Sequence, residues 1–133
     1  MEDATFKPLI SMPTRAKVGT NKWLRRLYRF LNKEFFKNKL PRIPVEWGIL
    51  PGNRLARVLW TKPKTKGEKP KPYLLQIRKE LKPKYLQKQV GFCILHEMGH
   101  IKLGYFVDCE DWGGEFDKLM FDLAKRGAFR YFW

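Results

Sequence analysis

Residues 90–101, VGFCILHEMGHI, decide the fold that this chain of 133 residues can adopt. Apolar side chains recur around this stretch at the three- and four-residue spacing of one helix face. Pro83 suits the first turn of a helix, and Gly104 suits its end. We therefore predict a mostly buried helix over residues 83–103. The apolar residues that define its face are Leu86, Val90, Cys93, Ile94, Met98 and Ile101.

The same stretch contains both histidines of the chain, in the pattern H-E-x-x-H. On a helix, His96 and His100 lie one turn apart, so both imidazoles project from one face and can bind one zinc ion. Glu97 lies beside them and can act as the general base on a zinc-bound water. The alternative is a core helix whose histidines only form hydrogen bonds, which leaves the glutamate between them without a packing reason. We expect one zinc ion per chain, with Glu97 as the catalytic residue.

Shorter segments on either side of this helix carry signals of their own. Residues 20–39 predict a basic amphipathic helix that begins after a capping Thr20 or Asn21. Runs of alternating apolar residues predict strands, and Val45, Trp47 and Ile49 share one side of the first run. The three predicted strands cover residues 43–49, 54–61 and 73–78. A last helix is expected from Glu115 to Arg126, followed by Gly127 as its stop.

These elements predict an α+β fold with one domain. It consists of an N-terminal helix, a small three-stranded and mainly antiparallel sheet, the H-E-x-x-H helix and a final helix. Hydrophobic residues make up 44% of the chain, which is enough to build a core. We expect residues 1–19 to form an extended or disordered tail and residues 20–133 to form the domain.

The net charge of +15 is distributed unevenly along the chain. Residues 1–82 contain 21 Lys and Arg against 6 Asp and Glu, whereas residues 83–133 contain 7 of each. Such asymmetry favours a polyanionic partner, most often a nucleic acid. No apolar run approaches the ~20 residues that span a bilayer, and the first residues lack a signal-peptide pattern. We expect a protein that is not secreted and has no membrane partner. It would lie in the cytoplasm, or in a nucleoid or nucleus.

Two basic segments are the candidates for contact with nucleic acid. One is the polar side of the N-terminal helix, and the other is the lysine- and proline-rich loop at 62–72. The alternative for both is a solvated surface that only keeps the protein soluble. The residues expected to bind nucleic acid are Arg25, Arg26, Arg29, Lys62, Lys64, Lys66, Lys69 and Lys71.

Catalytic zinc sites usually have three protein ligands and one water. Because the chain has no third histidine, the remaining ligand must be a carboxylate or a cysteine that follows the motif helix. The candidates are Asp108, Cys109, Glu110, Asp111, Glu115, Asp117 and Asp122. Of these, Asp117 and Asp122 fit solvated positions of the last helix.

Motifs spread over residues 22–127 resemble the SprT-like (Spartan-like) metalloprotease family. Residues 31–41, LNKEFFKNKLP, are similar to the end of that family's first helix, and residues 45–47, VEW, to its first strand. Residues 95–100, LHEMGH, match its zinc helix. Residues 113–116, GGEF, are similar to the H-G-x-E-[FW] element that opens its last helix.

The resemblance implies a third zinc-binding histidine directly before Gly113, but Trp112 stands there and cannot bind a metal. Glu115 follows three residues later, and positions i and i+3 share a helix face. A carboxylate at 115 would complete a site with two histidines and one glutamate. We therefore predict His96, His100 and Glu115 as the metal ligands. The alternative for Glu115 is a carboxylate that only complements the helix dipole.

The resemblance implies a small zinc metallopeptidase that cleaves proteins on or near DNA. Its partners would be a protein or peptide substrate and DNA, and the chain would be a monomer. We expect the substrate cleft between the edge strand of the sheet and the motif helix. Two other functions stay open: a catalytically degenerate SprT-like nucleic-acid-binding protein, and a metallopeptidase that cleaves a protein regulator without DNA.

Overall fold

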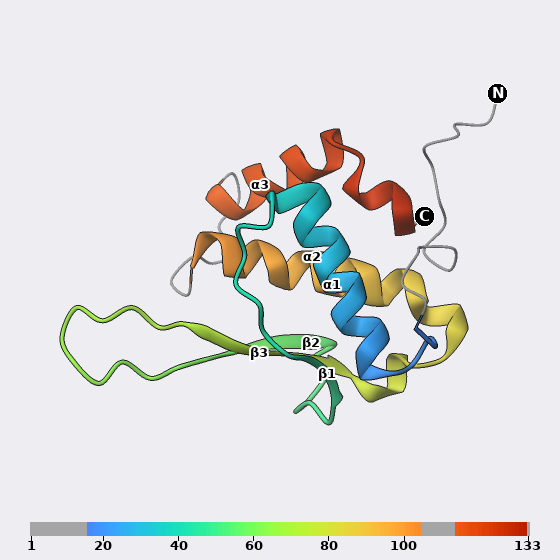
Figure 1. Cartoon of the computed structure of the whole chain (residues 1–133), viewed down its shortest axis with the longest axis horizontal. Helices are drawn as coiled ribbons and strands as arrows, with labels where there is room; N and C mark the ends of the chain where they lie inside the picture. Colours follow the sequence, from blue (N-terminus) through green and yellow to red (C-terminus); the bar gives the residue numbers. More distant parts are fainter. Residues whose placement is uncertain (1–15, 105–113, 133) are drawn as a thin grey trace.

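The computed structural model describes residues 16–104 and 114–132, which form three α-helices and one three-stranded sheet (Figure 1). The predicted α+β class is confirmed. The main elements are α1 (Asn21–Phe36), β1 (Val45–Gly48), β2 (Ala56–Trp60), β3 (Pro72–Arg78), α2 (Gln87–Leu103) and α3 (Glu115–Lys125). Three 3-10 turns accompany them: η2 (Lys79–Leu81), η3 (Lys84–Leu86) and η4 (Ala128–Phe132). None of the helices in the described part of the chain is long and apolar enough to cross a bilayer.

The sheet is mixed, with β3 in the middle and β1 and β2 at its edges. β1 pairs with β3 in parallel, with Val45 beside Leu75, whereas β2 pairs with β3 antiparallel, with Ala56 beside Ile77. The expectation of mainly antiparallel pairing therefore holds for only one of the two strand pairs. The reason is the chain order, because β2 and β3 form a hairpin and β1 is left to pair with the other side of β3. Strand periodicity in a sequence does not report this choice.

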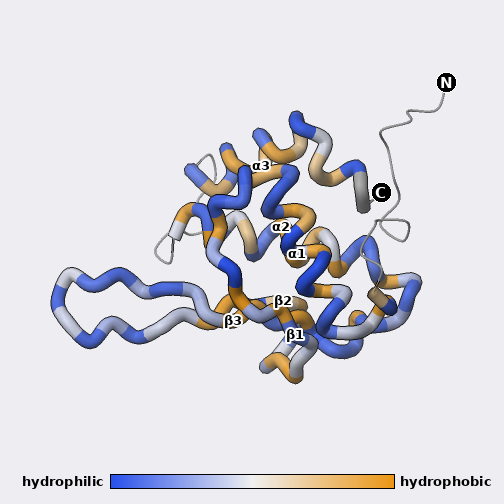
Figure 2. The backbone as a smooth tube through the Cα atoms, viewed as in Figure 1, coloured by the Kyte–Doolittle hydropathy of each residue, from blue (hydrophilic) through white to orange (hydrophobic). Residues whose placement is uncertain are grey.

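The helices lie on one side of the sheet, and the β2–β3 loop extends away from the body (Figure 1). α1 begins where predicted, because the Thr20 hydroxyl oxygen accepts a hydrogen bond of 3.1 Å from the N–H of Trp23. Its predicted apolar stripe is buried in the core. That stripe comprises Leu24, Leu27, Leu31 and Phe35. In Figure 2 hydrophobic residues recur along the helices and strands, whereas the β2–β3 loop is hydrophilic to neutral along its length.

Several predicted element limits are wrong. The first helix ends at Phe36 and not at residue 39, and the strands predicted over 43–49 and 54–61 are shorter in the structure. The motif helix begins at Gln87 instead of residue 83, because the N–H of Leu86 bonds to the carbonyl of Pro83 at 2.9 Å and closes a separate 3-10 turn. Pro83 therefore opens that turn and not the helix. Ile49 does not share the buried side of the first strand: β1 ends at Gly48, and Ile49 is 75% exposed.

The buried side-chain amide of Asn32, near the end of α1, binds the backbone of the segment that connects α1 to β1. The side chain of Asn32 is 6% exposed, and its Nδ2 donates to the carbonyl of Leu40 at 3.1 Å. Its Oδ1 accepts from the N–H of Leu40 at 3.2 Å. Lys37 and Asn38 turn the chain here with positive φ angles of 53° and 59°. The amide thus satisfies a buried stretch of backbone that has left the helix and has not yet entered the sheet.

We predict that Asn32→Ala lowers the free energy of unfolding by about 2–3 kcal/mol, because both backbone groups of Leu40 lose their partner in a buried place. Urea denaturation followed by circular dichroism measures this change. Lys33→Ala, at the exposed neighbouring position of α1, is the matched control and should change stability by less than about 0.5 kcal/mol. Equal effects of the two substitutions would contradict the proposed role of the amide.

Candidate metal centre and peptide cleft

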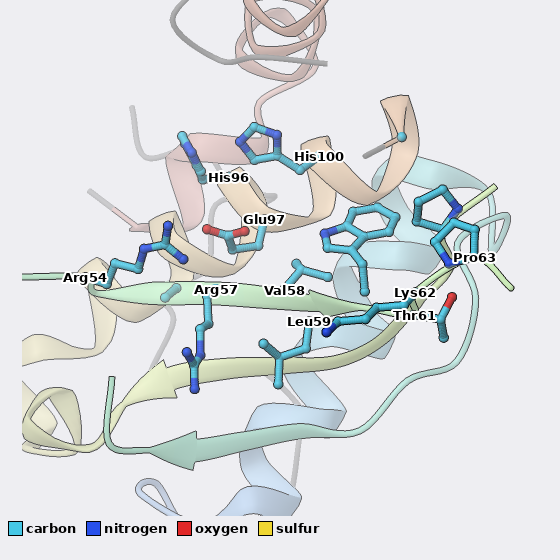
Figure 3. Close-up of a pocket in the computed structure, with 14 residues that line it drawn as sticks. Arg54, Arg57, Val58, Leu59, Thr61, Lys62, Pro63, His96, Glu97 and His100 are labelled. Carbon is cyan, nitrogen blue, oxygen red and sulfur yellow. The ribbon is translucent and has the colours of Figure 1, made fainter. Parts of the chain in front are cut away.

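His96 and His100 lie side by side on one side of α2 (Figure 3). Their ring centroids are 5.0 Å apart and their planes are inclined at 64°. His96 is exposed and His100 is half-buried, so neither imidazole is enclosed in the core. The spacing of four residues therefore brings the two rings together at the surface, as a shared metal ion requires.

Phe116 of α3 packs against both imidazoles. Its ring centroid lies 4.5 Å from that of His100, nearly parallel at 27°, and 4.9 Å from that of His96. Only 4% of Phe116 is exposed, so its own position is fixed by the core. Sequence reasoning missed its contact with the histidines. Its place directly after Glu115, in the segment that opens the last helix, was the available signal.

Gly99 allows α3 to approach α2 closely enough for this contact. A Cβ atom on Gly99 would lie 2.6 Å from Cε of Met120 and 3.1 Å from Cε2 of Phe116. The methionine methyl group can move aside, but the Phe116 ring is held between the helix and the two imidazoles. A glycine is therefore required at position 99 because a larger side chain would collide with α3, and not because of a special backbone conformation.

We predict that Gly99→Ala destabilises the protein by about 1–3 kcal/mol and displaces Phe116 from the imidazoles, because the added methyl overpacks the α2–α3 contact. Thermal unfolding measures the first effect, and the histidine ring proton shifts in NMR measure the second. Gly67→Ala in the β2–β3 loop is a control for loss of a glycine, with open space around it but a φ of 88° that costs some strain of its own. Histidine shifts that stay unchanged in Gly99→Ala would contradict this account.

Glu97 lies between the histidines in sequence and over β2 in space, with the guanidinium of Arg54 directed toward it (Figure 3). Burial raises the pKa of Glu97 to about 7, and the positive charge of Arg54 opposes part of that rise. Although His96 is exposed, the groups packed around its ring partly desolvate it and lower its pKa, and the neighbouring His100 lowers it further. The result is a carboxyl that can gain or lose a proton near neutral pH, beside an imidazole kept in its neutral, metal-binding form.

A cleft of about 860 Å³ opens between α2 and the edge strand β2, where the sequence led us to expect it. His96, Glu97 and His100 form its α2 side. Its other wall follows β2 from residue 54 into the start of the loop at 61–63. β2 is an edge strand, because β3 is the only strand beside it among the described residues, and residues 56–60 of β2 line this cleft. An extended peptide in the cleft can therefore reach both a strand edge and the histidine pair.

The described residues do not identify the third metal ligand. No group of three His, Cys, Asp or Glu side chains close enough to hold a metal ion occurs within residues 16–104 and 114–132. Glu115 is exposed at the first position of α3, directly before Phe116, and stays a prediction. Asp122 forms an ion pair with Arg126 at 2.9 Å, which fits a solvated helix position. The alternative ligands Asp108, Cys109, Glu110 and Asp111, and the departure at Trp112, lie outside the described residues.

The predicted nucleic-acid residues fall into two groups. Arg25 and Arg29 are exposed on α1, while Arg26 is half-buried. The five lysines of the second group are exposed on the β2–β3 loop, and only the first of them also lines the cleft. They are Lys62, Lys64, Lys66, Lys69 and Lys71. The loop has a defined turn, because Glu68 accepts hydrogen bonds from the Lys64 N–H and the Thr65 hydroxyl.

Sequence reasoning missed an arginine that lies beside the first group. Arg42, in the connection between α1 and β1, lines a cavity of about 240 Å³ together with Arg25, Tyr28 and Arg29. The arginines are up to 17 positions apart in the sequence, so only the packing of this connection against α1 brings them together. Within the described residues none of the three forms an ion pair. Their charges are therefore available to an anion.

Comparisons with models of protein families, with curated proteins and with solved structures found no match to this chain. The resemblance to the SprT-like family thus stays a prediction from the sequence motifs. What the chain can do chemically has to be inferred from its own site: the histidine pair, Glu97 and the cleft along β2.

Proposed function

We propose that this protein is a small zinc-dependent metallopeptidase that acts on proteins on or near DNA. One observation carries the proposal: His96, Glu97 and His100 meet in a cleft whose opposite wall is the edge strand β2. A metal site with a structural role only has no need for a carboxyl of raised pKa beside it or for a groove that fits a peptide.

The histidine pair fits a zinc ion. The two rings are adjacent, open to the cleft and, for His96, biased toward the neutral form that binds metals. His96 and His100 would hold the ion, with Glu115 or a side chain of segment 108–111 as the third ligand. Bound zinc would polarise the peptide carbonyl and lower the pKa of a water molecule to about 7.

Glu97 performs the proton transfers in this proposal. Its carboxylate accepts a proton from the attacking water and then donates it to the nitrogen of the leaving amine, as the C–N bond breaks. Burial raises the pKa of Glu97 to about 7, and a bound cation would lower it again, so the carboxylate that accepts the proton is present at neutral pH. The cleft positions the substrate, because the outer backbone groups of β2 can form strand hydrogen bonds with an extended peptide.

We predict that Glu97→Gln leaves zinc bound at about one ion per chain and lowers cleavage of an unfolded protein substrate by about 10²- to 10⁴-fold, because the proton acceptor is lost while the side-chain shape is kept. His96→Ala and His100→Ala should lose zinc and activity together. Metal content is measured by atomic emission and cleavage by mass spectrometry of the products. Full activity of Glu97→Gln would refute the assigned role.

The same metal measurement identifies the third ligand. Glu115→Ala should weaken zinc binding strongly, while Asp111→Ala serves as the matched variant from the alternative segment. Zinc occupancy that survives Glu115→Ala but falls in Asp111→Ala would transfer the ligand role to the acidic segment. Glu80→Gln, at an exposed position in η2, controls for loss of a negative charge and should change neither occupancy nor cleavage.

The nucleic-acid part of the proposal is supported by the cavity that Arg25, Arg29 and Arg42 surround. Guanidinium groups bind phosphate oxygens in a bidentate way, and three of them around one cavity can neutralise a phosphodiester backbone. The lysines of the β2–β3 loop offer further contacts, and the loop starts at the cleft. Binding through these groups would bring the cleft to proteins that lie on DNA.

We predict that replacing Arg25, Arg29 and Arg42 with glutamine weakens binding to double-stranded DNA for all sequences alike. The plot of log affinity against log salt has a negative slope, and the magnitude of this slope should fall by about 0.9 for each phosphate that the variant no longer neutralises. Fluorescence anisotropy over a salt series measures both quantities. Replacing Lys22, Lys33 and Lys37 with glutamine is the charge-matched control, because these three lysines lie on α1 or at its end and outside the cavity lining. An unchanged slope in the arginine variant would remove this site from the proposal.

A further inference from the structure

A second cavity opens beside the catalytic residues. It has a volume of about 330 Å³ and shares Ala56, His96 and Glu97 with the peptide cleft. The rest of its lining is Leu55, Phe92 and Cys93. Apart from the two shared catalytic groups, every side chain that lines it is uncharged and largely apolar. The proposed function uses none of those apolar side chains.

Helix spacing explains why the cavity lies next to the reacting groups. Phe92 and Cys93 come four and three residues before His96, so they occupy the preceding turn on the same side of α2. Leu55 directly precedes β2 and is 47% exposed, so its side chain is accessible to a ligand in the cavity. The opposite wall of the cavity is thus formed by the start of β2.

Phe92, which forms part of the α2 side of the cavity, is held in place by a second aromatic ring. The ring of Phe92 stacks on Phe129 of η4, with centroids 5.6 Å apart and planes inclined at 19°. A side chain that enters the cavity therefore meets a rigid aromatic surface, so little ordering cost accompanies binding. Preformed apolar pockets with a few polar groups at one end are typical of ligand sites.

The chemistry of the lining selects among side chains. A leucine, methionine or phenylalanine side chain finds apolar contacts with the four apolar residues of the lining. An aspartate or glutamate would lose its hydration next to the carboxyl of Glu97, where no lysine or arginine lines the cavity. A lysine could reach Glu97, but it would then occupy the group that has to transfer protons.

The cleft continues from His96 in the other direction along β2. There its lining includes Trp60, Lys62 and Pro63, at the base of the basic loop. A peptide that lies along β2 therefore passes the apolar cavity, the catalytic groups and the basic end of the cleft in that order. The residue that reaches the cavity is the one next to the bond that faces Glu97.

We propose that this cavity, which we call the Leu55–Cys93 pocket, binds a large apolar side chain of the substrate directly beside the cleaved bond. This inference rests on the proposed peptidase function and adds the class of substrate. Large apolar side chains are exposed mainly in unfolded or extended segments, so such segments are the substrates that the pocket selects.

The test uses the full-length, zinc-loaded protein and peptides that differ only in the residue beside the mapped cleavage site. Leucine or phenylalanine at this position should give a kcat/KM about 10- to 100-fold above that of aspartate. Leu55→Ala should reduce this ratio, because one wall of the pocket is removed, and Cys93→Leu should shift the preference toward alanine, because the pocket is filled. Ile49→Ala, exposed and outside the pocket lining, is the matched control and should leave the ratio unchanged.

A second readout does not depend on catalysis. In a Cys109→Ser chain, Cys93 is the one remaining thiol, and an occupant of the pocket should slow its alkylation by a maleimide. The leucine peptide should protect Cys93, and the aspartate peptide should not. If the protein cleaves all the peptides equally well and none of them protects Cys93, the proposed role of the pocket is wrong, while the peptidase function is still supported. Protection without cleavage of any peptide would support the pocket and overturn the peptidase function.

Discussion

The position of α2 is the constraint on which the rest of this structure depends. The helix contacts both other helices, the sheet and the last 3-10 turn, so most of its circumference is buried. The strip that borders the cleft and its side pocket carries Phe92, Cys93, His96, Glu97 and His100. The core therefore fixes the rotation of α2, and the rotation in turn decides that the reactive side chains meet the edge strand β2 and not the interior.

The contact between α2 and α3 gives the histidines their orientation. Because Gly99 has no side chain, the ring of Phe116 reaches both imidazoles and limits the directions in which they can turn. Binding groups that are held before a ligand arrives lose little freedom on binding. The same contact joins the last helix to the motif helix, so the stability of the fold and the geometry of the site depend on one interface.

The sequence predicted most elements because their signals are local. The Thr20 cap, the stripe of leucines in α1 and the glycine after each of the last two helices all act within a few residues of their own position. The errors lie at the ends of elements, where a local signal fits more than one backbone structure. Pro83 fits the start of a helix, yet it opens a 3-10 turn that precedes the helix. Ile49 fits the alternation of the first strand, but the pairing of that strand with β3 ends at Gly48.

The sequence by itself determined the helix that carries His96, Glu97 and His100. Residues four apart on a helix lie one turn apart, so the two imidazoles must project from the same side of it. Only the tertiary structure decided what these residues face. The parallel pairing of β1, the cavity around Arg25, Arg29 and Arg42, and the packing of Phe116 on the imidazoles all join segments that are far apart in the chain. Their cause is the packing of whole elements around one core, which no local pattern of residues records.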